Sequence, residues 1–188
     1  RNNLILRHVN RIGKYAFYGC SGFTGSLDFP VPNSNDYVTI DDYAFYGCSR
    51  FNGNLNLEHV SYIGNYAFYC CSGLSGELSF NYNFAYIGDY AFYNCSGLTG
   101  ELEIEYNIKY IGTNSFAGCT GLSDKLSIGG NSELRIGRDA FYLTNFTIVT
   151  YENNIVPLCP ESIGLTNDVD IYVDNNYPSQ TFCTYTIN

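Results

Sequence analysis

The feature that most constrains the fold of this 188-residue chain is an internal repeat with a period near 24 residues. The motif IGxYAFYxCSxxxGxLxL, or a close variant, begins at Ile12, Ile40, Ile63, Ile87 and Ile111, and a degenerate sixth copy begins at Ile136. A unit this short cannot bury an apolar face alone. Neighbouring copies must therefore stack into a solenoid with a continuous core.

Each copy also carries two apolar residues separated by one polar residue. This alternation predicts a strand with one buried face. A single strand has no partner inside its own copy, so it pairs with the same strand of the next copy and builds a parallel sheet along the array. The predicted buried pairs are Leu27/Phe29, Leu55/Leu57, Leu78/Phe80, Leu102/Ile104 and Leu126/Ile128.

The AFYGC segment, residues 16–20 in the first copy, has a different spacing. One helical or 3₁₀ turn would point Ala16, Phe17 and Cys20 inward together. The glycine after each anchor isoleucine, Gly13 in the first copy, suits a tight corner that needs unusual backbone angles. Asp41 replaces it once and tolerates the left-handed region better than most residues.

The string xxIGxxAFxxCxxLxxxLxI resembles the BspA-like subclass of leucine-rich repeats, which is related to repeats of the Treponema pallidum type. The resemblance covers residues 4–148 and implies a right-handed, mostly-β leucine-rich repeat solenoid, with a parallel sheet on one face and short 3₁₀ or helical turns and loops on the other. We expect a partial repeat over 1–11, the array over 12–148, and a degenerate cap over 149–188 that ends with the strand at 171–174. The family resemblance also implies a secreted or cell-surface protein of the adhesin type.

Composition excludes several classes. The net charge of −9 disfavours a nucleic-acid partner, because phosphate binding needs a basic face. No run of apolar residues is long enough to span a membrane. The sequence shows no basic segment followed by an apolar one, as a signal peptide would have, and no initiator methionine, so we expect an excised or mature piece of something longer. Its basic start (Arg1, Arg7, Arg11, Lys14) and its acidic end favour weak head-to-tail self-association.

Five of the eight cysteines share one position of the repeat and should be buried free thiols. They are Cys20, Cys48, Cys71, Cys95 and Cys119. Stacked equivalents point in parallel, which suits a disulfide poorly. Cys70 replaces a glycine, is expected to face outward and is the candidate reactive thiol. Pairing of Cys159 with Cys183 in the cap stays open.

No constellation predicts catalysis, a metal or a cofactor. His8 and His59 share one column two coils apart, too far to hold one metal ion. Glu101, Glu103 and Glu105 alternate on one strand beside Glu77, and three interpretations stay open: a solvated acidic patch, a weak Ca²⁺ site or a glycosidase pair. We expect no enzyme, since a flat sheet face gives no pocket to raise a carboxyl pKa.

Two surfaces are candidates for protein binding. Columns of tyrosine run along the array, either as a stacked cover of the coil edge or as a recognition surface. The outward side chains of the predicted sheet form the preferred candidate, because solenoids commonly bind partners there. Its residues are Asp28, Asn54, Asn56, Glu77, Ser79, Glu101, Glu103 and Lys125. We expect a non-catalytic interaction module that binds host or neighbouring-cell proteins, such as extracellular-matrix or plasma proteins; the alternative is a structural spacer in a longer surface protein.

Overall fold

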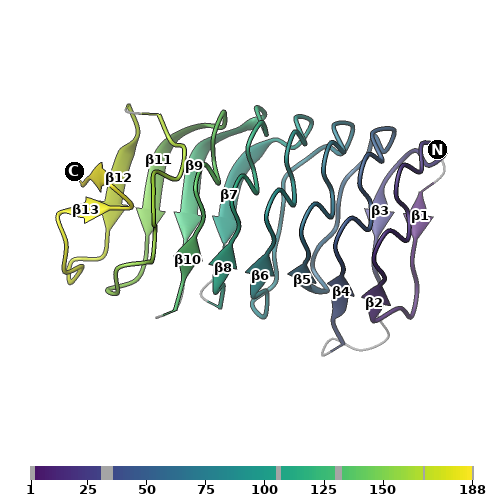
Figure 1. Cartoon of the computed structure of the whole chain (residues 1–188), viewed down its shortest axis with the longest axis horizontal. Helices are drawn as coiled ribbons and strands as arrows, with labels where there is room; N and C mark the ends of the chain where they lie inside the picture. Colours follow the sequence, from purple (N-terminus) through teal and green to yellow (C-terminus); the bar gives the residue numbers. More distant parts are fainter. Residues whose placement is uncertain (1–2, 31–35, 105–106, 130–132, 167, 188) are drawn as a thin grey trace.

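The repeats stack along one axis in a computed structural model that describes residues 3–30, 36–104, 107–129, 133–166 and 168–187. The chain forms a parallel β-solenoid of about seven turns, with the N-terminus at one end and the C-terminus at the other (Figure 1). The described residues contain no helix. Arg1, Glu105 and residues 31–35 of the insertion before Ile40 lie outside the described residues.

One row of strands runs through the anchor isoleucines. Its members are β2 (Arg11–Ile12), β4 (Val38–Ile40), β5 (Val60–Ile63), β6 (Tyr86–Ile87), β8 (Tyr110–Ile111) and β10 (Arg135–Ile136), which form a six-stranded parallel sheet in the order β10-β8-β6-β5-β4-β2. Isoleucine pairs with isoleucine throughout, as Ile63 does with Ile87. The sequence had not predicted this sheet, because strands of two to four residues are too short to show a clear alternating pattern.

The second row is the predicted leucine-rich sheet. A four-stranded parallel sheet has the order β12-β11-β9-β7, made of β7 (Gly100–Ile104), β9 (Leu122–Ile128), β11 (Asn145–Tyr151) and β12 (Asp170–Val173). Toward the N-terminus, β1 (Leu4–Ile5) pairs with β3 (Leu27–Asp28). Single parallel bridges, such as that from Leu27 to Leu55, continue the ladder from this pair to the four-stranded sheet. The predicted apolar pairs are all buried. The parallel sheet along the array is confirmed.

The turn after each anchor isoleucine is not the helical or 3₁₀ turn that the spacing predicts. In the second coil, the Ala44 amide donates to the Asp41 carbonyl of its own turn. The next amide, that of Phe45, instead donates to the Ala67 carbonyl of the following coil at 2.8 Å. Amides therefore alternate between bonds inside the turn and bonds to the next coil, so the turn is itself part of the inter-coil ladder.

Left-handed residues cause this alternation. φ is 57° at Tyr43, just before the alanine, and 71° at Gly47, just before the cysteine. Each reverses the local course of the backbone and prevents a helix from continuing. The tyrosine position is left-handed in every repeat: Tyr15, Tyr43, Tyr66, Tyr90, Asn114 and Asp139. The alanine, phenylalanine and cysteine of the inner coils still point inward and are fully buried. In the first coil the prediction fails, because this coil lies at the end of the array: Ala16 is exposed, and Phe17 and Cys20 are half-buried.

The glycine after the anchor isoleucine is required for a reason other than the predicted one. Neither Gly64, Gly88, Gly112 nor Asp41 has a positive φ, so the expectation of unusual backbone angles is wrong. A Cβ on Gly88 would lie only 2.5 Å from the Asn65 backbone nitrogen. The glycine therefore permits close approach of two coils, because backbone occupies the space that a side chain would need.

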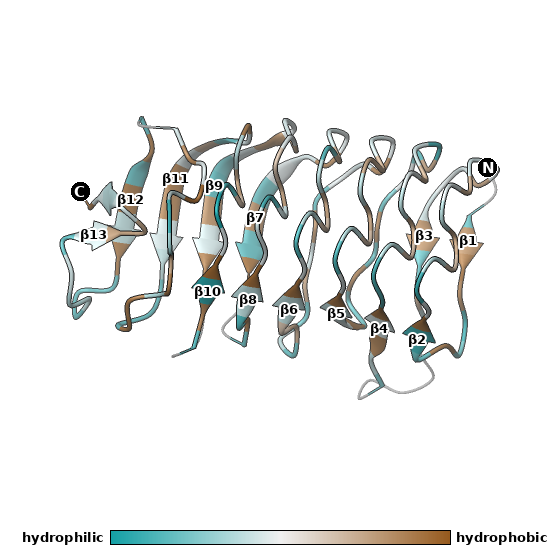
Figure 2. Ribbon diagram, viewed as in Figure 1, coloured by the Kyte–Doolittle hydropathy of each residue, from teal (hydrophilic) through white to brown (hydrophobic). Residues whose placement is uncertain are grey.

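Columns of identical side chains fill the interior. Phe45, Phe68 and Phe92 stack with ring centroids 5.2 and 5.3 Å apart, and the column continues in both directions. Figure 2 shows hydrophobic segments recurring from coil to coil along the solenoid. At the C-terminal end, β13 (Thr181–Phe182) and β14 (Tyr185–Thr186) form an antiparallel pair. A disulfide joins Cys159 to Cys183, with the Cα atoms 5.1 Å apart.

Candidate functional site: the outward sheet face

The outward side chains of the leucine-rich sheet form a row that crosses its strands. Pairing places Ser79 beside Glu103, Glu103 beside Ser127, and Ser127 beside Thr150. The flanking residues on each strand are buried, so alternation directs these polar side chains to solvent. The row ends on two exposed apolar side chains, Ile5 at 43% and Tyr172 at 49% exposure.

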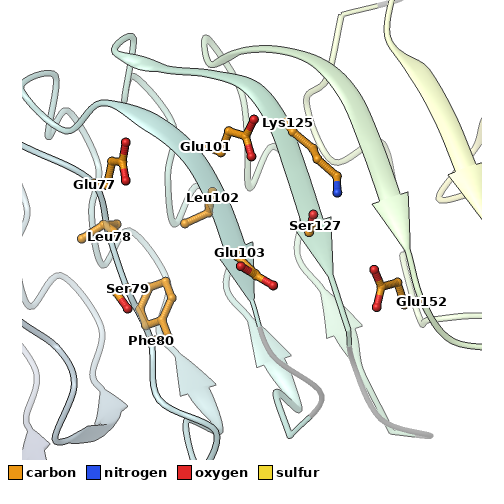
Figure 3. Close-up of a pocket in the computed structure, with 10 residues that line it drawn as sticks. All are labelled: Glu77, Leu78, Ser79, Phe80, Glu101, Leu102, Glu103, Lys125, Ser127 and Glu152. Carbon is orange, nitrogen blue, oxygen red and sulfur yellow. The ribbon is translucent and has the colours of Figure 1, made fainter.

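Two adjoining grooves follow this face. The first, of about 340 Å³, is lined by polar residues that include Glu77, Glu101, Glu103, Lys125 and Glu152 (Figure 3). The second, of about 440 Å³, lies nearer the N-terminus and shares Glu77 and Ser79 with the first. All eight residues that the sequence singled out line one or both: Asp28, Asn54, Asn56, Glu77, Ser79, Glu101, Glu103 and Lys125. Their role in binding stays a prediction.

The charge of the first groove is mainly negative. Figure 3 shows Glu101 and Glu103 on β7 and Glu77 on the neighbouring segment, with Lys125 as the one base among the labelled lining residues. Glu77, Glu101 and Glu103 are exposed. An exposed surface that is mainly negative suits recognition of polar and basic groups.

Tyrosine columns cover another surface of the solenoid. Tyr66 stacks on Tyr43 and Tyr90 at 4.9 and 4.8 Å, and Tyr69 stacks on Tyr46 and Tyr93 at 4.7 and 5.0 Å. Tyr15 and Tyr18 begin these two columns, and each is 51% exposed. A third column joins Tyr62, Tyr86 and Tyr110. The predicted stacking is confirmed, and because inner ring faces cover one another, outer edges and hydroxyls remain for contact.

A ladder of polar side chains, not anticipated from the sequence, lies beside the first tyrosine column. Asp42 Oδ1 accepts the Asn65 amide at 2.9 Å, Asn65 Oδ1 accepts the Asp89 amide at 2.8 Å, and Asp89 Oδ1 accepts the Thr113 amide at 2.9 Å. Tyr110 also donates its hydroxyl to Asp89 Oδ1 at 2.7 Å. Burial and this bond raise the pKa of Tyr110. The recurrence of Asp or Asn two residues after the anchor isoleucine was the available signal.

The repeated cysteines are free thiols, as predicted. They are buried in the inner coils, whereas Cys20 in the first coil is half-buried, contrary to the prediction. Cys71 Sγ lies 3.0 Å from the Phe45 carbonyl oxygen and donates to it, and Cys95 and Cys119 repeat this contact one and two coils on. Burial raises the pKa of Cys48 to about 11 and that of Cys119 to about 12. Cys70 is half-buried in a left-handed position of the turn.

The two histidines are the remaining residues that the sequence examined as metal ligands. His8 is exposed and His59 half-buried. The described residues contain no group of three or more His, Cys, Asp and Glu side chains arranged to hold a metal ion. Within the same ranges, no helix is long and apolar enough to cross a membrane.

The comparison with family models agrees with the repeat architecture. The family model of the BspA type leucine rich repeat region matches in six copies, over residues 2–123 and 38–163. A leucine-rich repeat protein from Bacteroides ovatus, solved by crystallography, is similar with a TM-score of 0.41 and 18% sequence identity. The similarity covers 93% of this chain and 61% of that protein, so the chain spans less than two thirds of its length. No curated protein shows significant similarity in sequence.

Proposed function

Because this chain belongs to the BspA-type leucine-rich repeat family, we propose that it is a non-catalytic, surface-exposed module that binds a partner protein through the outward sheet face. The family supports an interaction or repeat module in general. The adhesin role, the extracellular or cell-surface location and the choice of face are our proposal.

One observation carries the choice of face. The two grooves adjoin across several strands and bring all eight predicted side chains to one surface. Short polar side chains alternate with buried apolar ones, so the rows are held in register by the core beneath them. A partner that lies across the strands would therefore meet a rigid, pre-formed row, which lowers the entropy lost on binding.

The partner class follows from charge. Glu77, Glu101 and Glu103 outnumber Lys125 in the first groove, which favours a partner with a basic patch. Host matrix and plasma proteins are the partners that we propose to test first. Weak head-to-tail self-association also stays a prediction. Arg11 and Lys14 already pair with Asp41 and Asp42 at 2.8 and 3.8 Å, which reduces the free positive charge near the start of the chain.

The experiment is binding of the purified chain to immobilised fibronectin and fibrinogen at low and physiological salt. A double variant, Glu101→Lys with Glu103→Lys, should weaken saturable binding at least tenfold, which is about 1.4 kcal/mol. The matched control is Glu58→Lys with Asp168→Lys, which changes the net charge equally at two exposed residues outside the grooves. Equal loss in both variants would show general electrostatic attraction and refute the assignment of this face.

A structural spacer is the second candidate. Continuous hydrogen-bond ladders from coil to coil favour it, because they give the array the stiffness that a spacer needs. Absence of binding to every immobilised protein, with the chain folded, would favour the spacer over the adhesin.

A further inference from the structure

The first two coils contain an occupied binding site for an ammonium group. Lys14 Nζ lies 3.8 Å from Asp42 Oδ2. It also lies 5.3 Å from the ring centroid of Tyr15 and 5.7 Å from that of Tyr43. Both distances are within the range of a cation–π contact. The chain thus shows that one carboxylate and two stacked tyrosines hold a lysine side chain on this surface.

The third and fourth coils repeat this arrangement without the lysine, except that Tyr66 stacks on Tyr43 as well as on Tyr90. Asp89 stands at the repeat position of Asp42, and Tyr66 and Tyr90 stand at those of Tyr15 and Tyr43. The ring centroids are 4.8 Å apart in this pair and 5.0 Å apart in the first. Tyr66, like Tyr15, has a left-handed backbone, so the rings leave their coils in the same way.

The carboxylate is held by the same bond in both copies. Asp42 Oδ1 and Asp89 Oδ1 each accept an amide of the following coil at 2.9 Å, which leaves Oδ2 as the second oxygen. Asp42 uses that oxygen for Lys14. Asp89 differs in one respect, because its Oδ1 also accepts the Tyr110 hydroxyl.

The position equivalent to Lys14 is Asn65. Its side chain is neutral and its Oδ1 already accepts the Asp89 amide at 2.8 Å. Among the ion pairs of the described residues, none involves Asp89. This copy of the site therefore keeps its carboxylate and its two rings and has no lysine of its own.

We propose that Asp89, Tyr66 and Tyr90 bind a lysine side chain of a partner protein. The ammonium would contact the carboxylate and lie beside the outer edges and hydroxyls of the two rings, at the place that Lys14 takes in the first copy. A single contact of this kind, made by half-buried side chains at the surface, is weak. It acts as one anchor point of a larger interface on the tyrosine surface, and it does not depend on the outward sheet face.

The test uses the peptide Ac-Gly-Lys-Gly-NH₂ and its Nε-acetyl-lysine form, which differ by one charge. NMR titration at constant ionic strength follows the tyrosine ring signals. We expect Tyr66 and Tyr90 to shift more than Tyr62 and Tyr86, and only with the charged peptide. Asp89→Asn should reduce the shifts at least threefold. This variant keeps an oxygen that can accept the Thr113 amide, as Asn65 does for Asp89, so the ladder stays intact.

Two controls come from the chain itself. Glu58→Gln removes the same charge at an exposed residue outside the tyrosine columns and should leave the shifts unchanged. Lys14→Met should vacate the first copy, so that Tyr15 and Tyr43 begin to respond to the charged peptide. Equal responses to the two peptides, equal effects of Asp89→Asn and Glu58→Gln, or no new response after Lys14→Met would each overturn the proposal.

Discussion

Replacement of Gly88 by alanine tests the close approach of the coils. The added Cβ would lie 2.5 Å from both the Asn65 nitrogen and the Gly64 carbonyl carbon, about 0.9 Å inside the 3.4 Å at which ordinary contact begins. Both atoms are backbone, so relief requires the two coils to move apart. Three inter-coil bonds of 2.8 Å lie at this point and would lengthen: Gly88 N–H to Ile63 O, Asp89 N–H to Asn65 Oδ1, and Tyr66 N–H to Asp89 O.

Each of these hydrogen bonds contributes about 1 kcal/mol net, so the expected loss is about 3 kcal/mol. With a urea m-value of about 2 kcal/mol/M, the unfolding midpoint should fall by roughly 1.5 M. Gly13 supplies the matched control, because it occupies the same repeat position and a Cβ added there would meet no atom within 4 Å. Both substitutions lower the entropy of the unfolded chain equally, so Gly13→Ala should be neutral or stabilising by up to about 1 kcal/mol.

The assay is urea unfolding followed by far-UV circular dichroism, with the m-value checked because repeat arrays can unfold in parts. The difference between the two variants isolates the steric effect. Equal midpoints for Gly88→Ala and Gly13→Ala would refute the explanation by close coil approach.

Four further predictions concern the thiols, the disulfide and backbone strain. Burial raises the folded pKa of four thiols above 9.0, so the unfolded chain releases these protons first; they belong to Cys48, Cys71, Cys95 and Cys119. The free energy of unfolding should therefore be constant below about pH 8 and fall from pH 9 toward 11 by about 1.4 kcal/mol per pH unit for each thiol. Urea midpoints across pH 7–10.5 measure this, and a flat profile contradicts it. Alkylation of the folded chain at pH 8 should label Cys70 ahead of the fully buried Cys71, as peptide mass spectrometry would show, whereas equal labelling would refute the burial argument. Cys183→Ser should destabilise the C-terminal coils by about 3 kcal/mol, because the bond to Cys159 closes a 24-residue separation; an unchanged melting temperature would count against it. Tyr66→Asn should change the free energy of unfolding by less than about 1 kcal/mol, because relief of a left-handed tyrosine offsets most of the loss of its ring contacts with Tyr43, Tyr69 and Tyr90; a loss above about 2 kcal/mol would show that the ring contacts dominate.

Features with a strong periodic pattern could be predicted from the sequence. The buried strand pairs, the inward cysteines, the tyrosine columns and the position of the eight outward residues all follow from the repeat and from alternation. The outcome at Cys159 and Cys183 could not be decided in this way, because the C-terminal region lacks the repeat that fixed the other cysteines.

Two wrong predictions, for the glycine and for the turn, concern features that contacts between coils determine. The glycine after the anchor isoleucine looked like a turn residue, yet the atoms that exclude a side chain at Gly88 belong to the preceding coil. Likewise, the spacing within AFYGC suggested a helical turn, because a local pattern does not show that the Phe45 amide bonds to the next coil. The Asp89 site could not be predicted from the sequence either, because the contacts of Lys14 with Asp42, Tyr15 and Tyr43 are seen only in three dimensions.

The uniform direction of the turn amides has a consequence for how such arrays change length. Every inner junction joins amides of one coil to carbonyls of the next in the same pattern, as Phe45 to Ala67 and Phe68 to Ala91 show. A gene duplication or deletion of one whole unit therefore creates a junction of the kind already present. Residues 63–86 form such a unit, and its removal would bring Ile40 beside Ile87 with phenylalanine, cysteine and tyrosine columns still in register. Whole-repeat recombination can thus lengthen or shorten the molecule while both ends stay as they are.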